Sequence, residues 1–222
     1  ACGDINKDGW IDIVVSVYIG DGGLSDSGKV NIYFNNEGVL DSLPSFVSVP
    51  MYTFSCALGD ADGDGDLDIA VACGEMYNNE PDYLKIFFNE NGNFTSTPQW
   101  HSSNKLIGID VNFADFDNNG FLDVFVGSVA YPNCLYLADS SGNIINSPAW
   151  QSIETINGNS LDIGYFHSST PNVVITNNDQ LGGNGKNLMY SFSNPIQANS
   201  SAVWQSTYFS NNPASTIIPN RL

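Results

Sequence analysis

Short apolar runs, many of them alternating with polar residues, recur along the whole chain and are separated by clusters of glycine, asparagine, aspartate and proline. Runs of this length, bounded by turn-forming residues, are typical of β-strands. No convincing helical period intervenes, so the pattern predicts an all-β fold. The clearest runs form two series, residues 12–17, 68–73 and 123–128 and residues 30–35, 84–89 and 134–139.

These runs belong to an internal repeat. Asp4, Asp60 and Asp115 open equivalent acidic segments and are 56 and 55 residues apart. Each repeat ends in a short strand whose aromatic residue stands two positions after a proline, namely Phe46, Trp100 and Trp150. A degraded fourth copy has expected strands at residues 161–166, 172–176, 188–192 and 203–204. The repeats span residues 1–50, 51–104, 105–156 and 157–208.

Each repeat contains four expected strands, and an acidic loop joins the first strand to the second. Such units, repeated with glycine and aromatic landmarks, are typical of β-propeller blades. We therefore expect a β-propeller of four-stranded antiparallel blades, built from four repeats of about 55 residues. The whole chain is then one repeat domain.

The two ends of the chain do not fit a simple array. Only three residues precede the first acidic loop, so we expect repeat one to lack its first strand and the chain to be processed or truncated. We predict that residues 209–222 supply the missing strand, because pairing removes an exposed strand edge. Three arrangements stay open: completion in cis, which closes a ring, completion in trans between subunits, and continuation into a longer protein.

The acidic loops carry the clearest chemistry. Residues 60–68 contain five aspartates at alternate positions, and the loops at 4–12 and 115–123 have the same pattern. Like charges this close repel, and a folded chain holds them together when a cation lies between them. Oxygen ligands with a glycine in mid-loop indicate calcium rather than a transition metal. We predict three Ca²⁺ sites with ligands at loop positions 1, 3, 5, 7 and 9, which are Asp4, Asn6, Asp8, Trp10, Asp12, Asp60, Asp62, Asp64, Asp66, Asp68, Asp115, Asp117, Asn119, Phe121 and Asp123.

Position 7 differs among the three loops, so its backbone carbonyl rather than its side chain is the expected ligand. An EF-hand would require a bidentate glutamate at position 12, where all three loops have valine. The alternative, that the loops are only Asx-rich hairpin turns, explains one loop better than three in register. The loop of repeat four, residues 165–171, has no carboxylate and carries His167 at a ligand position, so we predict no calcium there.

With these motifs the sequence resembles the FG-GAP/VCBS repeat family, whose loops of the type Asp-x-Asp-x-Asp-Gly-x-x-Asp sit in the blades of calcium-binding propellers. Integrin α-chain heads and some fungal and bacterial lectins contain such repeats. The resemblance covers nearly the whole chain and is weakest in the fourth repeat. It implies metal ligands at positions 1, 3, 5 and 9 of each loop, in agreement with the residues derived above, and it implies that relatives close their rings with more than four blades.

Charge narrows the range of partners. The formal net charge is −18, with only six lysines and arginines. Three, five and three of the 24 acidic residues lie in the three acidic loops, so bound cations would neutralise part of this charge. No basic patch is present to bind phosphates, which argues against nucleic acid and against anionic membranes as partners. No apolar run approaches the length of a membrane span. Calcium loops and few lysines favour an extracellular or cell-surface protein.

The four cysteines leave two interpretations open. Cys56 and Cys73 flank the second acidic loop and fall nearly opposite each other if the two strands pair around it. A cross-strand disulfide and two buried free thiols are both compatible with this spacing. Cys2 and Cys134 have no obvious partner.

No catalytic motif is recognisable, so we expect a protein that is not an enzyme. The acidic residues outside the calcium loops, such as Glu75 and Glu154, are expected to be solvated. Loops between the second and third strands differ in length, and recognition often resides in such loops. Tyr77, Tyr83 and Tyr131 lie there and would either stack on sugar rings or pack between blades, of which packing is favoured.

Three functions follow from these observations. The first is an extracellular calcium-binding structural or adhesive protein, whose partner is a second copy of itself in an oligomer or filament. The second is a lectin-like propeller that binds cell-surface glycan or protein. The third is a non-catalytic accessory domain of a secreted enzyme. The unfilled strand position at the chain ends favours the first.

Overall fold

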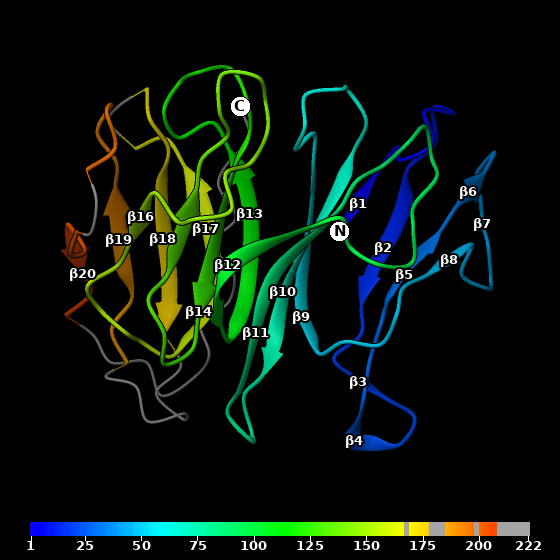
Figure 1. The fold of residues 1–222 in the computed structure, drawn as a ribbon, viewed down its shortest axis with the longest axis horizontal. Helices are drawn as coiled ribbons and strands as arrows, with labels where there is room; N and C mark the ends of the chain where they lie inside the picture. The colour runs from blue at the N-terminus through cyan, green and yellow to red at the C-terminus, as the bar shows by residue number, and fades with distance from the viewer. Residues whose placement is uncertain (167–168, 178–184, 198–199, 208–222) are drawn as a thin grey trace.

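The computed structural model describes residues 1–166, 169–177, 185–197 and 200–207. This part of the chain contains no helix and forms four four-stranded antiparallel sheets, one per repeat (Figure 1). The prediction of an all-β chain of four-stranded antiparallel units is therefore confirmed. Two small hairpins, β3–β4 (Ile19–Gly20 and Gly23–Ser27) and β6–β7 (Asn35–Asn36 and Val39–Leu40), extend from the first sheet.

The strands follow chain order within each sheet. The first sheet contains β1 (Cys2–Gly3), β2 (Asp12–Ser16), β5 (Val30–Tyr33) and β8 (Phe46–Val47). The second contains β9 (Thr53–Gly59), β10 (Asp68–Glu75), β11 (Glu80–Phe87) and β12 (Trp100–Leu106). The third contains β13 (Gly108–Ala114), β14 (Asp123–Ser128), β15 (Cys134–Tyr136) and β16 (Trp150–Gln151). The fourth contains β17 (Gly158–Gly164), β18 (Asn172–Asn177), β19 (Leu188–Ser191) and β20 (Trp204–Gln205).

The first repeat differs from its prediction. Its first strand is not missing: Cys2 and Gly3 form β1 and pair with Ile13 and Asp12 of β2. The Val14 N–H also donates to the carbonyl of Ala1 at 2.9 Å. Two residues are thus enough to occupy the edge next to β2. Residues 209–222, which were expected to fill this place, lie outside the described part of the chain.

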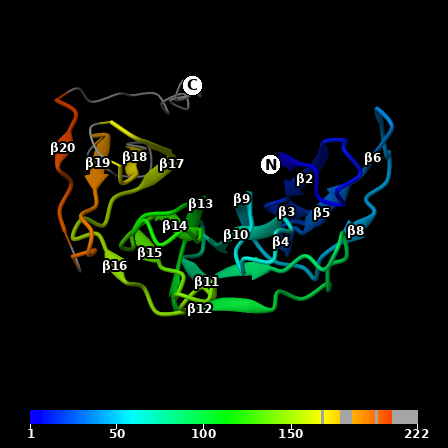
Figure 2. The ribbon, with the colours of Figure 1, turned by 90° about the horizontal axis from the view of Figure 1, so that it is seen from above.

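The four sheets follow one another along an arc (Figure 2). The first strands β9, β13 and β17 lie on its inner side and contact one another in sequence, whereas the fourth strands β8, β12, β16 and β20 lie on its outer side. The first and fourth sheets stand at opposite ends of the arc. Each sheet therefore has one neighbour before it and one after it, except at the two ends.

Face-to-face packing between consecutive sheets forms the core. We call the side of a sheet that is turned toward the preceding sheet its front face, and the opposite side its rear face. At the first junction, Val14, Val30 and Ile32 on the rear face of the first sheet pack against the front face of the second. In the second sheet both faces of the middle strands are consequently covered, and all eight residues of β10 are buried. The front-face residues at the three junctions are Ile69, Val71 and Phe87, then Val124, Val126 and Tyr136, then Val173, Ile175 and Tyr190.

Candidate metal centres

The three acidic loops join the first strand to the second strand of the first three sheets, as the sequence predicted. Since they connect equivalent strands, they lie on the same side of the arc. Each loop is fixed by its own aspartates, which accept hydrogen bonds from backbone N–H groups. The hydrogen bonds that fold the loop therefore also place the oxygen atoms of its aspartates.

The aspartate at position 9 is the anchor of each loop. Asp12, Asp68 and Asp123 are fully buried at the start of the second strand. One carboxylate oxygen accepts the N–H of the residue at position 2, with N···O distances of 2.9, 2.7 and 2.7 Å. The other accepts an N–H from the segment after the third strand, at 2.8 Å in all three loops. Each oxygen keeps lone-pair capacity for a cation, since a carboxylate oxygen accepts more than one contact.

The aspartate at position 1 closes the turn. Asp4, Asp60 and Asp115 each accept the N–H of the glycine five residues later, at 2.9, 3.0 and 2.9 Å. These glycines have φ angles of 90°, 88° and 92°, in the left-handed region that glycine adopts without strain. The glycine at position 6 is thus needed for the backbone to curl around the carboxylate. This agrees with the role that the sequence pattern suggested.

Carboxylates converge in two of the loops. Asp60, Asp62 and Asp68 each bring an oxygen to within 4.8 Å of the others, and Asp115, Asp117 and Asp123 do the same. In the first loop the third position is Asn6, a neutral amide where the other two loops have a carboxylate. The structure thus assembles positions 1, 3 and 9 in two of the three predicted sites. Both clusters consist of hard oxygen donors, which suit Ca²⁺ or Mg²⁺ rather than soft-ligand metals.

Burial makes these carboxylates difficult to ionise without a cation. Desolvation raises the pKa of Asp68 and of Asp123 to about 7, although backbone N–H donors oppose the shift. Desolvation also raises the pKa of Asp62 and of Asp117, and the neighbouring aspartates add to the effect. A divalent cation would reverse this by compensating the charge. The two clusters could therefore hold a metal ion.

Positions 5 and 7 carry further predicted ligands. At position 5, Asp64 and Asn119 each accept the N–H of position 7 at 2.8 Å, and Asp8 does the same in the first loop. At position 7, the Asp66 carboxylate pairs with Lys7 and accepts the Asn91 N–H at 2.7 Å. The Phe121 ring lies against Gly63 and Gly142, where an added Cβ would come within 3.0 Å of it. Trp10 is exposed.

Two contacts between the first and second loops were not expected from the sequence. Lys7 reaches from the first loop to Asp66 of the second, and this ion pair raises the pKa of Lys7 and lowers that of Asp66. Asn89 donates from its side-chain amide to the Ile5 carbonyl at 2.9 Å and to the Leu67 carbonyl at 3.2 Å. Asn89 follows the third strand in the same way as Asn35, and this repeated asparagine was the available signal.

In the fourth repeat, Asn172 stands where the other repeats have the buried aspartate. Its side-chain oxygen accepts the Phe166 N–H at 3.2 Å, so the anchoring hydrogen bond is retained without the charge. Among the described residues 165, 166 and 169–177 there is no carboxylate. His167 lies outside the described residues.

Of the two interpretations of the cysteines, a disulfide or free thiols, the structure has free thiols. All four are unpaired, and Cys73 and Cys134 are buried. Cys56 pairs in register with Val71, and a bulge places Cys73 opposite Thr53. Cys56 and Cys73 were expected to fall nearly opposite each other, but Asp68 pairs with Gly59 and the bulge shifts Cys73 further from Cys56. A cross-strand disulfide therefore does not form.

Two expectations about the variable loops change. Glu75, expected to be solvated, is fully buried at the end of β10 and accepts the Tyr18 hydroxyl at 2.8 Å. Burial would raise its pKa, but the hydrogen bonds from Tyr18, Asn78 and Tyr77 bring the pKa below its usual value. Tyr131 is half-buried against the core, as favoured, whereas Tyr77 is 63% exposed.

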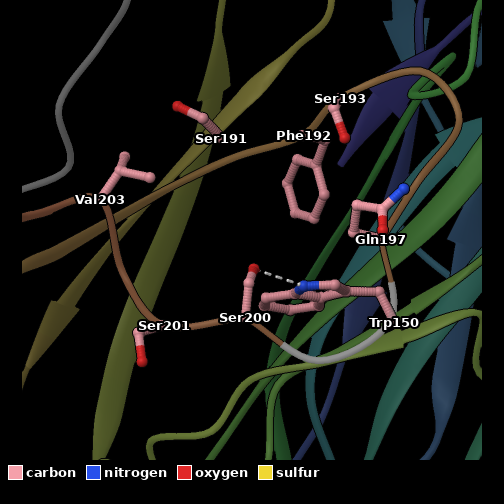
Figure 3. Close-up of a pocket in the computed structure, with 8 residues that line it drawn as sticks. All are labelled: Trp150, Ser191, Phe192, Ser193, Gln197, Ser200, Ser201 and Val203. Atoms are coloured by element: carbon pink, nitrogen blue, oxygen red, sulfur yellow. Dashed lines mark hydrogen bonds between the residues drawn. The ribbon is translucent and has the colours of Figure 1, made fainter.

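A pocket of about 330 Å³ lies beside the junction of the third and fourth sheets (Figure 3). Its lining combines two aromatic rings with hydroxyl and amide groups and contains no charged side chain. The Trp150 indole N–H donates to the Ser200 hydroxyl at 2.8 Å and is thereby satisfied. The lining residues are Trp150, Ser191, Phe192, Ser193, Gln197, Ser200, Ser201 and Val203.

Among the described residues, no helix has the length and apolar character that crossing a membrane requires.

Comparison with solved structures adds a fold-level likeness. The crystal structure of BBS1N in complex with ARL6DN, soaked with lead, matches with a TM-score of 0.52 and 10% sequence identity, and covers 86% of this chain and 52% of that one. The crystal structure of the V. cholerae biofilm matrix protein Bap1 matches with a TM-score of 0.46 and 17% identity, and covers 97% of this chain and 39% of that one. The chain thus spans about half the length of these proteins or less.

No curated protein sequence matches the chain. A family model does: the FG-GAP-like repeat model matches residues 4–71 and again residues 60–126. These two matches span the three acidic loops up to β14 and cover more than half of the chain. The chain therefore belongs to the FG-GAP-like repeat family.

Proposed function

We propose that this chain is a calcium-binding β-propeller module of an extracellular or cell-surface protein with a structural or adhesive role. The observation that carries the proposal is the convergence of three carboxylates in each of two loops, within 4.8 Å of one another. An unneutralised cluster of this kind destabilises a fold, and a bound Ca²⁺ converts it into a stabilising contact. We propose a third site in the first loop, where Asn6 supplies the amide oxygen.

The role of the ion would be structural. Each loop leads directly from the first strand into the buried second strand, so a bound ion would fix the register of both. Extracellular calcium modules bind with dissociation constants of about 0.1–1 mM. Binding to the folded state alone adds about 2.7 kcal/mol per site when calcium is a hundredfold above the dissociation constant. Sites of that affinity would fill where calcium is abundant, as it is outside the cell.

Support for a non-catalytic role comes from the same groups. The aspartates of the clusters accept backbone hydrogen bonds inside their own loops, an arrangement suited to holding an ion. We propose that the protein acts through binding and assembly, that its partners are copies of itself or cell-surface molecules, and that it binds no nucleic acid. The acidic balance of the chain supports the last point.

Calorimetric titration of chelator-treated protein with Ca²⁺ tests the proposal. We expect heat of binding with three sites, a rise in melting temperature with Ca²⁺, and a smaller rise with Mg²⁺, which dehydrates reluctantly. Asp68→Asn and Asp123→Asn should each remove one site. Asp21→Asn, an exposed aspartate in the β3–β4 hairpin, is the matched control and should keep all sites. Absence of any calcium-dependent stabilisation would contradict the proposal.

Carbohydrate binding is the second candidate function, and the uncharged pocket beside Trp150 favours it. The hydroxyl groups of its serines and the Gln197 amide offer hydrogen-bond partners for a neutral sugar, whereas the Trp150 and Phe192 rings are buried and form the floor of the pocket. Titration with neutral monosaccharides, monitored by tryptophan fluorescence, tests this candidate. A Gln197→Ala variant that binds as well as the original would contradict it.

A further inference from the structure

The third residue of each acidic loop contacts the sheet that follows. In the first loop Asn6 lies against Gly92, and in the second loop the Asp62 carbonyl lies against Gly142. The approach is so close that a Cβ added to either glycine would come within 3.1 Å of the loop. Both glycines belong to the turn after the third strand of the following sheet. An acidic loop therefore contacts the next sheet as well as joining two strands of its own.

The third loop makes the corresponding contact with the fourth sheet. Asn194, in the segment after β19, donates from its side-chain amide to the carbonyl of Asp117 at position 3. Phe116, at position 2, is fully buried and packs edge to face on Phe192, with ring centroids 5.0 Å apart and an angle of 78° between the planes. One polar and one aromatic contact thus join the third loop to the fourth sheet.

The two loop residues that make these contacts lie inside the third candidate metal centre. The Asp117 side chain brings a carboxylate oxygen to within 4.8 Å of those of Asp115 and Asp123. The Phe116 N–H donates to the Asp123 carboxylate at 2.7 Å. A cation held by these oxygens would fix the backbone of the loop, and with it the carbonyl and the ring that the fourth sheet contacts.

The fourth sheet has no comparable cluster among its described residues. Asn172 stands at the position of the buried aspartate, and its side-chain oxygen accepts the Phe166 N–H at 3.2 Å. The described part of the loop before it, residues 165, 166 and 169–171, contains no carboxylate. The sheet whose own loop lacks acidic ligands is thus in contact with a neighbouring loop that has them.

Phe192 also forms part of the uncharged pocket. Its ring packs edge to face on Trp150, with centroids 5.1 Å apart and an angle of 78° between the planes (Figure 3). Apart from Trp150, all the lining residues are described residues between 191 and 203, in the fourth repeat. A single ring therefore contacts both the third acidic loop and the floor of the pocket.

We propose that the calcium ion of the third loop holds the fourth sheet in place and thereby keeps the pocket formed. Phe116 and Asp117 carry the effect of the ion to Phe192 and Asn194. The inference rests on the calcium role proposed above and deepens it, because it makes one of the three ions a regulator of the pocket. The ions of the first two loops lie next to other sheets and would not have this effect.

The coupling acts on local stability. Parts of a folded chain open locally, and a ligand that binds the closed form lowers the population of the open form. Loss of the third ion would release the backbone of Phe116 and Asp117, so the fourth sheet should open more often. Coupling between two sites typically changes such an equilibrium by about 5–150-fold.

Hydrogen exchange of the whole chain in millimolar calcium, followed by mass spectrometry, tests the proposal. Asp123→Asn removes one carboxylate of the third cluster and should speed the exchange of β18 and β19 by about 5–150-fold. Peptides that contain residues 191–197 should follow β19, because they line the pocket. Asp68→Asn makes the same change in the second loop and should leave the exchange of β18 and β19 as in the original. The same acceleration in both variants, or none in Asp123→Asn, would overturn the proposal.

Asn194→Ala separates the contact from the ion. Calorimetry should still find three calcium ions, whereas β18 and β19 should exchange about two- to tenfold faster, as expected for the loss of one hydrogen bond. Asn93→Ala is the matched control: this exposed asparagine lies in the corresponding turn of the second sheet and donates to the Glu90 carbonyl at 3.1 Å. It should leave β18 and β19 unchanged. An Asn194→Ala protein that exchanges like the original would contradict the inference, even if Asp123→Asn does not fold.

Failure of this inference is separable from failure of the proposed function. A chain that calcium stabilises, but whose fourth sheet exchanges alike in Asp123→Asn and Asp68→Asn, contradicts the inference and leaves the calcium role intact. A chain that neither binds calcium nor gains stability from it contradicts the proposed function itself.

Discussion

The side-chain amide of Asn89 donates a 2.9 Å hydrogen bond to the carbonyl of Ile5, in the acidic loop of the preceding sheet. The backbone N–H of the same residue donates to Asp68 at 2.8 Å. One asparagine thereby holds the anchor aspartate of the second loop and the backbone of the first. The two loops are coupled through this buried residue.

Asn89→Ala should therefore destabilise the fold and weaken calcium binding in both loops. The Ile5 and Leu67 carbonyls would lose their partner in a buried place, which costs about 1–3 kcal/mol. Chemical denaturation with and without calcium measures the effect. Asn36→Ala, which removes an exposed hydrogen bond to Asp41, should change stability by no more than about 0.5 kcal/mol. Equal effects of the two substitutions would contradict the coupling.

Replacement of Asp66 and replacement of Asp68, both in the second loop, should have different effects on calcium binding. Asp66 points to Lys7 and Asn91 rather than to the cluster, whereas Asp68 is part of the cluster. Asp66→Asn should keep the number of bound calcium ions, because only the backbone of residue 66 is expected to bind. Asp68→Asn should lose one ion. Calorimetric stoichiometry decides between them, and loss of an ion in Asp66→Asn would show that its carboxylate is a ligand.

Stability in chelator should fall as the pH rises. The pKa of Asp68 and of Asp123 is about 7 in the folded protein, above the value of about 3.9 in an unfolded chain. Between these values the folded state holds protons that the unfolded state has released, so raising the pH through this window removes stability. Melting temperatures in chelator should therefore be higher near the acidic end of this window than above it.

The slope should reverse in saturating calcium, because protons then compete with the ion for the same oxygens. Asp68→Asn in chelator should reduce the pH dependence, since one of the two carboxyl groups with a pKa of about 7 is gone. A melting temperature in chelator that rises steadily across this window would contradict the assignment.

The two tryptophans Trp100 and Trp204 should differ in their effect on folding. Trp100 packs on Tyr136 within a covered junction, and its replacement by alanine should cost about 3–5 kcal/mol. Trp204 is half-exposed, and Trp204→Ala should change the free energy of unfolding by only about 0.5 kcal/mol. Denaturant titration at a protein concentration low enough to keep the chain monomeric compares them. Similar losses would mean that Trp204 is already covered within one copy.

Thiol labelling tests the cysteine assignment. Cys73 and Cys134 are buried, and desolvation raises the pKa of the Cys73 thiol to about 12 and that of Cys134 above its usual value. We expect Cys2, which is exposed, to react at once and the two buried thiols to react only on unfolding. Titration in denaturant without reductant should find four thiols. A count of two would indicate a disulfide.

The regular part of the fold could be read from the sequence because it is repeated. Strand positions, the acidic loops and the aromatic residue at each fourth strand recur at a nearly constant period, so a single misreading is corrected by the other copies. Register within a strand is less secure. Tyr136 pairs with Val124 as Phe87 pairs with Ile69, so Cys134 is equivalent to Lys85 and not to Leu84, with which the sequence aligns it.

Features that depend on tertiary contacts could not be predicted from the sequence. Nothing in the order of residues indicates that Lys7 pairs with Asp66, or that Glu75 is buried beneath Tyr18, since each pair is more than fifty residues apart. The two-residue strand β1 was missed because a run of three residues has no periodicity to read. Its pairing is imposed by the neighbouring β2.

The arc of sheets has a mechanical consequence. Among the described residues, the main contacts of each sheet are with the sheet before it and the sheet after it, so stability is largely a sum of local terms rather than a property of one shared core. A pulling force applied between the two ends would act on the junctions in series, and they would rupture one at a time. Extension would therefore proceed in discrete steps of similar length. The chain would absorb work at each step instead of unfolding in one event.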